Sequence, residues 1–254
     1  MPVRSPYEVA LGDGLYELHP SLRRYFSALP DGCVGIGEGV FAEVGTPRRW
    51  LHRLLRPLER RGVLYAGHAR SVRFRVVNRT VAAQGGSGGA GDGGGAEGDD
   101  AGLAVARREL DLPGGVWTMA DSVSFAAASG RVVDRIGCPT TAVASFDVEV
   151  RDGGLLLTSR RIGLMLGRLR VRVPRPFAPV VRLGERRDPV SGLQRVELTI
   201  DAPLVGRIYG YRGHFAYGVV RDAGESSADA RGHEAGTRGA DGGTEQTEEL
   251  DDDG

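Results

Sequence analysis

The sequence predicts a mainly β protein of the α+β class, in which a large curved antiparallel sheet or barrel follows two N-terminal helices. Two observations lead to this fold class. Apolar residues at helical spacings of three and four are confined to the first sixty residues or so, whereas from Val63 onward apolar and polar residues alternate as in half-buried strands. About nine or ten such strands follow, and a sheet of that size has to curve strongly or close.

The first helix is expected over Gly14–Leu29, where leucines and Phe26 recur at spacings of three and four and Pro20 starts or kinks the helix. The next segment, Asp31–Val44, is rich in glycine. Its glycines follow the pattern G-x-G-x-G rather than the phosphate-binding G-x-G-x-x-G, so we expect an ordinary loop or an irregular strand.

A second helix is expected with Thr46 as its N-cap and Pro47 at its first position. An apolar stripe of tryptophan and leucines follows, and arginines occupy the other faces. We interpret it as an amphipathic helix that packs on a sheet with its arginines in water. The alternative is a helix that lies on an anionic membrane surface.

The first strand pair is expected at 72–77 and Leu103–Leu112. Between them, Ala82–Gly102 has no apolar residue larger than alanine and is expected to be a disordered loop at a hairpin tip. The remaining strands are expected at Val116–Phe125, Arg131–Ile136, Val143–Val150, Leu155–Arg161, Arg168–Val173, Val180–Arg187 and, as a closing pair, within Leu193–Val220.

We expect one β-rich domain over residues 1–221 and a disordered acidic tail over 222–254. The tail holds eleven acidic residues against two arginines, so it carries a charge of −9 and the rest of the chain +9. All cations of the chain are arginine, which we attribute to codon bias. The charge split allows the tail to screen the basic body.

Several classes of protein and site are disfavoured by composition. Two cysteines are too few for a disulfide framework, and the five histidines lack zinc-binding spacing, so we expect no metal and no cofactor. The N-terminus does not read as a signal peptide, and no window spans a bilayer. We therefore expect a cytoplasmic protein.

Five short motifs in a fixed order resemble an uncharacterised bacterial family, catalogued as the domain of unknown function 4166. They are G-x-W-T-M-x-D-S at Gly115–Ser122, D-R-I-G at Asp134–Gly137, D-G-G-L at Asp152–Leu155, V-P-R-P-x-A-P at Val173–Pro179 and P-L-x-G-x-x-x-x-Y-x-G at Pro203–Gly213. The resemblance covers about Leu11–Val220 and implies no activity, ligand or catalytic residue.

Some members of that family look like C-terminal partners of NAD(P)-binding, saccharopine-dehydrogenase-like domains. This chain lacks such a domain, so dinucleotide chemistry is not carried over. What the resemblance implies is a reductase-like partner protein.

A barrel of more than about eight strands has an interior wider than side chains fill, which predicts a cavity. Aromatic and thioether side chains with a few polar groups are what a small-molecule pocket needs. The candidate ligand-binding residues are Trp117, Met119, Asp121, Tyr209, Tyr211, Arg212, His214 and Tyr217. The alternative is that these aromatics only fill the core.

The leading functional hypothesis is that the cavity binds a small apolar or amphipathic molecule without catalysis. One alternative is an enzyme that uses His214, Asp121 or a tyrosine as proton carrier. Another is an interaction module for an anionic partner that the acidic tail regulates, through arginine faces such as Arg73, Arg75 and Arg79. No nucleic-acid-reading motif accompanies those faces, so nucleic acid is disfavoured.

Overall fold

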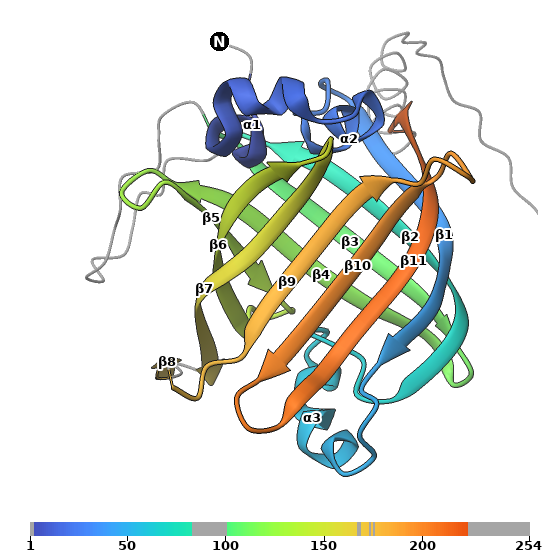
Figure 1. Ribbon diagram of the computed structural model, residues 1–254, viewed down its shortest axis with the longest axis vertical. Helices are drawn as coiled ribbons and strands as arrows, with labels where there is room; N and C mark the ends of the chain where they lie inside the picture. The colour runs from blue at the N-terminus through green and yellow to red at the C-terminus, as the bar shows by residue number, and fades with distance from the viewer. Residues whose placement is uncertain (1–2, 83–100, 167–168, 173, 175, 223–254) are drawn as a thin grey trace, which may run out of the picture. The chain divides into compact units, whose positions relative to one another are not determined.

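A computed structural model describes residues 3–82, 101–166, 169–172, 174 and 176–222, and its main feature is a closed antiparallel β-barrel (Figure 1). The ten barrel strands follow the order β6-β5-β4-β3-β2-β1-β11-β10-β9-β7, and pairing of β6 with β7 closes the ring, while β8 pairs only with β7. The mostly β prediction is confirmed, and of the two architectures it allowed, the chain forms the barrel. The strands are β1 (Cys33–Gly45), β2 (His68–Val81), β3 (Leu103–Leu112), β4 (Gly115–Ala126), β5 (Arg131–Ile136), β6 (Ala142–Arg151), β7 (Gly154–Leu166), β8 (Leu169–Arg172), β9 (Val180–Arg187), β10 (Gln194–Ala202) and β11 (Gly206–Arg221).

The helices before the barrel differ from the single helix expected at Gly14–Leu29. They are α1 (Pro6–Leu11), a 3-10 helix η1 (Gly12–Glu17) and α2 (Pro20–Phe26). The Ser5 side chain caps α1 in a capping box with Glu8, a start signal that lies ahead of the expected helix. Pro20 begins a new helix rather than kinking a longer one, with the His19 ring as its N-cap.

Of the two alternatives expected for the glycine-rich segment, the irregular strand is the one that forms, as β1 with a register shift at Phe41–Glu43. This strand separates the two helical regions. Gly35, Gly37 and Gly39 lie beside β11, whose Phe215 and Tyr217 cross over them. A Cβ at Gly35 would lie 1.8 Å from the Tyr217 hydroxyl, so the glycines make room for aromatic rings on the neighbouring strand. The expectation that both helices precede the sheet was therefore wrong.

The second helix, α3 (Leu51–Arg60), begins later than expected, because Thr46 and Pro47 belong to the segment that leads into it. Leu51 and Leu55 are buried, whereas Trp50 and Leu54 of the predicted apolar stripe are exposed. The arginines of this helix are exposed, as predicted.

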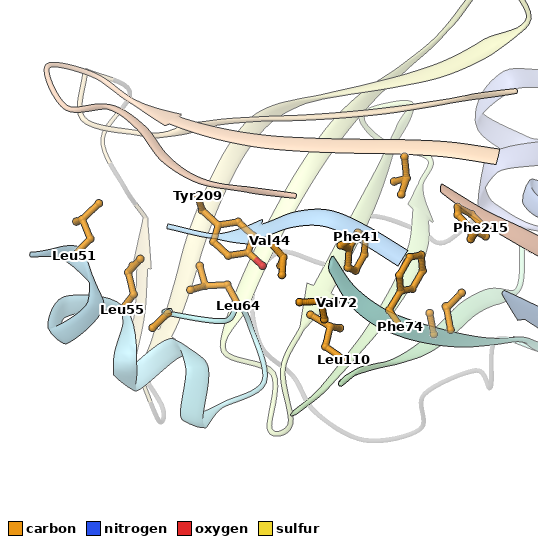
Figure 2. Packing of buried hydrophobic residues seen from close by; sticks show 14 residues of the cluster. Phe41, Val44, Leu51, Leu55, Leu64, Val72, Phe74, Leu110, Tyr209 and Phe215 are labelled. Atoms are coloured by element: carbon orange, nitrogen blue, oxygen red, sulfur yellow. The ribbon is translucent and has the colours of Figure 1, made fainter. Parts of the chain in front are cut away.

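Two apolar clusters fill the ends of the barrel. One joins α1, η1 and α2 to β4–β7, with Leu18, Leu22 and Phe26 at its centre. The other joins α3 to β1, β2, β3, β10 and β11, and Figure 2 shows Leu51, Leu55 and Leu64 at its α3 end. The helices α1 and α2 thus lie at one end of the barrel and α3 lies at the other (Figure 1).

Two predicted segments lie almost wholly outside the described residues: the glycine-rich loop, of which 83–100 is not described, and the acidic tail, of which 223–254 is not described. The predicted domain boundaries therefore stay predictions. Among the described residues, no helix has the length and apolarity that crossing a membrane requires. The same part of the chain holds no cluster of three or more histidine, cysteine or acidic side chains suited to a metal ion.

Candidate ligand cavity

Polar side chains interrupt the apolar inner face on several of the barrel strands. Strand register places Asp121 opposite the buried Ala106, Asp134 opposite Val123, and Glu185 opposite Val196. Arg108 of β3 and Asn78 of β2 share the inward face with Ala106 and Val76. The barrel interior therefore has a polar set of groups, and β-strand alternation is what turns them inward.

The strongest contact in this set is the ion pair between Arg108 Nη1 and Asp121 Oδ1. The Asp121 side chain is only 5% exposed and that of Arg108 22%, so the guanidinium is the more accessible partner. Burial raises the pKa of Asp121, and the charge of Arg108 opposes that shift. Because the pair is largely buried, removing either partner would leave an uncompensated charge and would destabilise the fold.

Among the described residues, no cation is bonded to the other two carboxyl groups, those of Asp134 and Glu185. Burial, reinforced by the charge of Asp121, raises the pKa of Asp134 well above its usual range. Burial raises the pKa of Glu185 from 4.5 to about 7, although Glu185 accepts a hydrogen bond from Gln194 Nε2. Three carboxyl groups thus share one arginine, and the interior favours added protons or added positive charge.

Hydroxyl and amide groups extend the polar set toward the end of the barrel that α1 and α2 cover. The ring of Tyr25, from α2, packs edge-on against that of Tyr217 at 4.7 Å between centroids. Burial raises the pKa of Tyr217 to about 12, so its hydroxyl stays protonated. The amide of Asn78 lies near both tyrosines.

Four oxygens of this interior are buried without a hydrogen-bond partner among the described residues. They belong to Asn78 (Oδ1), Asp134 (Oδ1), Gln194 (Oε1) and Tyr217 (the hydroxyl). Buried polar atoms are seldom left unpaired in folded proteins. The amide oxygens of Asn78 and Gln194 can only accept hydrogen bonds, so the interior has acceptors that need donors.

A cavity of about 60 Å³ reaches this polar set from the end covered by α1 and α2. It lies beneath these helices and beside β2, β3, β4 and β9. Its apolar wall includes Phe26, Leu29 and Ala106, and its polar lining includes Tyr7, Tyr25, Asn78, Arg108, Asp121 and Glu185. The cavity combines apolar surface with a few convergent polar groups, as small-molecule sites do.

Of the eight predicted site residues, Asp121 lines this cavity. Trp117, Tyr209 and Tyr211 belong to the apolar cluster on the α3 side, where the Trp117 indole donates to Glu59 O at 3.1 Å. Met119 faces inward opposite Arg108, and Tyr217 packs on the cluster beside Tyr25. The predicted Tyr, Trp and Met residues thus lie outside the lining of this cavity, and most of them pack in the core.

Arg212 and His214 do not face the cavity, because they occupy the other face of β11. Arg212 Nη2 lies 3.4 Å from Glu43 Oε2, and His214 Nε2 lies 3.6 Å from Asp188 Oδ2. The two acidic partners, Glu43 and Asp188, are neighbours of these side chains on the outer surface. Because side chains alternate along β11, Arg212 and His214 lie on the face opposite to the inward-facing candidate residues.

The residues that sequence reasoning missed are Arg108 and Glu185, together with Tyr7, Tyr25 and Asn78. For two of them a signal existed: Arg108 shares its strand face with Ala106 and Leu110, and Glu185 shares its own with Leu183. A charged residue at an apolar position of an alternating strand indicates a polar group inside a barrel.

A second hollow, of about 200 Å³, lies over Gly45 and Gly210, where two glycines face each other across β1 and β11. Its charged groups are paired within the protein: His68 Nε2 lies 2.8 Å from Glu43 Oε1, and Arg207 Nε lies 2.7 Å from Asp201 Oδ1. With its charges satisfied, this hollow lacks the unpartnered groups found in the barrel interior.

A comparison with family models connects the barrel to a known group of sequences. Residues 95–215 match the family described as Domain of unknown function (DUF4166). Over this segment the chain is similar to that family. The resemblance carried by the five motifs is thereby confirmed over this range, while a bacterial origin stays a prediction. No curated protein and no solved structure matches the chain significantly.

The groups in and around the cavity come partly from the matched segment, residues 95–215, and partly from residues before it. It holds Arg108, Asp121, Asp134 and Glu185, which form the charged part of the interior. The helices α1 and α2 and the strand that carries Asn78 precede it. The charged floor of the cavity therefore belongs to the matched segment, and most of its cover does not.

Proposed function

We propose that the barrel binds a small amphipathic molecule, whose polar head enters the cavity beneath α1 and α2. The observation that supports this most is the buried polar set, in which three carboxyl groups share one arginine and several acceptors lack a donor. A core that only had to be stable would not retain such groups, because buried unpaired polar atoms cost about 1–3 kcal/mol each.

The chemistry of the head follows from the same groups. Of the unpaired acceptors, Asn78 Oδ1 lines the cavity and needs a donor, and the carboxyl groups of Asp121 and Glu185 in the same lining favour positive charge. An ammonium group supplies three N–H donors and one positive charge. The proposed ligand is therefore an amine-headed amphiphile rather than a fatty acid, whose carboxylate would add a further acidic group to an interior with three carboxyl groups and one arginine.

The cavity size limits how much of the ligand lies inside. A volume of about 60 Å³ exceeds the share of one water molecule in the liquid, about 30 Å³, but is far below the roughly 300–1,000 Å³ of drug-sized pockets. The head group fits within it, and the apolar tail lies along the wall formed by Phe26, Leu29 and Ala104.

Calorimetric titration with chain-matched probes tests this proposal. Dodecylamine is expected to bind about tenfold or more tightly than dodecanoic acid, since the acid leaves the buried acceptors unpaired. Ala106→Phe, which fills the cavity, should abolish amine binding, whereas Ala216→Phe on the exposed face of β11 should not. Equal binding of the two probes, or amine binding that Ala106→Phe leaves intact, contradicts the proposal.

A second candidate function is proton transfer in the same cavity. Glu185 lines the cavity with a pKa raised by burial to about 7, which suits a general acid or base at neutral pH. Asp121 is held by Arg108, and His214 is on the outer surface, so Glu185 replaces both as the proton carrier. Incubation of a metabolite extract with the protein and with Glu185→Gln separates the functions: only an enzyme produces mass changes that the variant loses.

The third hypothesis, an anionic partner bound at arginine faces of the strands, has less support. Arg75 lies 3.6 Å from Glu38, so this face is partly neutralised. The side chains of Arg168, Arg170 and Arg172 lie outside the described residues. A reductase-like partner and a cytoplasmic location remain predictions.

A further inference from the structure

The barrel end that carries α3 has a concentration of cations without acidic partners. In the segment from Thr46 to Arg61 the only acidic residue is Glu59. Six arginines of this segment are exposed, namely Arg48, Arg49, Arg53, Arg56, Arg60 and Arg61. Within the part of the chain that the structure describes, none of the six forms an ion pair.

Several arginines on the barrel wall are paired with acidic side chains. Arg107 lies 3.0 Å from Glu109, Arg131 lies 2.6 Å from Asp147, and Arg195 lies 3.1 Å from Glu197. Other exposed wall arginines, such as Arg73, Arg161 and Arg186, form no ion pair among the described residues, so the wall is only partly neutralised. The α3 end differs in that its six exposed arginines lie within one short segment and none of them is paired in the described part of the chain.

Large apolar side chains are exposed at the same end. Trp50 and Leu54, which are 58% and 66% exposed, stand one helical turn apart. Leu204, in the turn between β10 and β11, is fully exposed and has a positive φ of 65°, a backbone conformation that leucine rarely adopts. Val116, at the turn between β3 and β4, is 64% exposed.

Two contacts show that these turns adjoin α3. Arg48 Nε donates to Arg207 O at 3.3 Å, which ties the β10–β11 hairpin to the segment before the helix. Trp117 Nε1 donates to Glu59 O at 3.1 Å, which ties the start of β4 to the last turn of the helix. In Figure 1, α3 and the β10–β11 turn lie at the same end of the barrel.

We propose that this end of the barrel binds the surface of an anionic lipid bilayer. Unpaired arginines are attracted to anionic head groups, while tryptophan and leucine side chains insert at the boundary between head groups and acyl chains. Nucleic acid would satisfy the arginines but would leave Leu54, Leu204 and Val116 in water. The proposal concerns the end opposite the α1–α2 cavity and stands independently of the proposed ligand.

Vesicle flotation with the full chain tests the proposal. Vesicles of phosphatidylcholine mixed with phosphatidylglycerol should retain the protein, and vesicles of phosphatidylcholine alone should not. Replacing Arg49, Arg53 and Arg56 together by glutamine should weaken binding roughly hundredfold, because each arginine contributes about 1 kcal/mol near an anionic surface.

The control removes the same charge from the barrel wall, by replacing Arg107, Arg151 and Arg195 with glutamine. If this control loses binding as much as the α3 variant, net charge alone acts and the proposal fails. A second variant, Leu54→Ser with Leu204→Ser, keeps every charge and should weaken vesicle binding. Retention of duplex DNA instead of anionic vesicles, or vesicle binding unaffected by the leucine variant, also overturns the proposal.

Discussion

Inside the barrel, the protonation of individual residues decides how the interior is charged. Arg108 neutralises Asp121, whereas no cation in the described part of the chain is bonded to Asp134 or Glu185, and burial raises the pKa of both. At neutral pH the interior therefore contains carboxyl groups that readily hold protons. An amine-headed ligand would displace such protons, so its binding should strengthen as pH rises above 7, the region where Glu185 ionises.

Glu185→Gln tests the ionisation of this residue without any ligand. Because the folded state raises the Glu185 pKa from 4.5 to about 7, folding takes up a proton in that range, and stability falls as pH rises through it. Between about pH 4.5 and pH 8, the wild type should lose on the order of 3 kcal/mol of unfolding free energy relative to the variant. Urea denaturation at a series of pH values measures this loss.

The control for that experiment is Glu149→Gln on the exposed face of β6, where Glu149 pairs with Arg151 at 3.2 Å. This variant should follow the wild-type pH dependence. If Glu185→Gln follows it as well, Glu185 has an ordinary pKa and the electrostatic description of the interior is wrong.

At the level of elements, alternation in the sequence predicted most strands closely but left β1 open between a loop and an irregular strand. Strands β3, β5 and β9 have the predicted bounds because their apolar positions alternate clearly. In β1 the inward positions are glycines, whose purpose depends on Phe215 and Tyr217 of β11, residues far away in the sequence. A local pattern cannot reveal a requirement that a distant neighbour imposes, and the same limit hid Tyr7 and Tyr25 from the predicted site.

Gly39→Ala should destabilise the barrel at the β1–β11 pairing. A Cβ at Gly39 would lie 2.1 Å from His214 O and 2.5 Å from Phe215 Cβ, and neither backbone nor Cβ atoms can move aside easily. We expect a loss of at least about 1–3 kcal/mol, the usual cost of overpacking. Gly218→Ala on β11 has open space around its Cβ and should change stability by less than about 0.5 kcal/mol. Similar melting temperatures for the two variants would contradict this role of Gly39.

On the scale of the whole molecule, the barrel separates two surfaces with different chemistry. The α1–α2 end covers a small polar cavity, and the α3 end exposes arginines and apolar side chains. The sequence predicted a cavity and the inward face of β11, but not where along the barrel the free volume lies. That location depends on which end the helices fill, because Leu51 and Leu55 pack into the α3 side and leave Trp117 and Tyr209 in solid core.

Native mass spectrometry after exposure to a lipid and metabolite extract tests the central claim most directly. The wild type and Ala216→Phe should retain a bound small molecule, whereas Ala106→Phe should be recovered at its bare mass. Matching melting temperatures of the two variants would show that both are folded. A wild type that stays empty, or an adduct that Ala106→Phe still carries, would contradict a ligand in the cavity beneath α1 and α2.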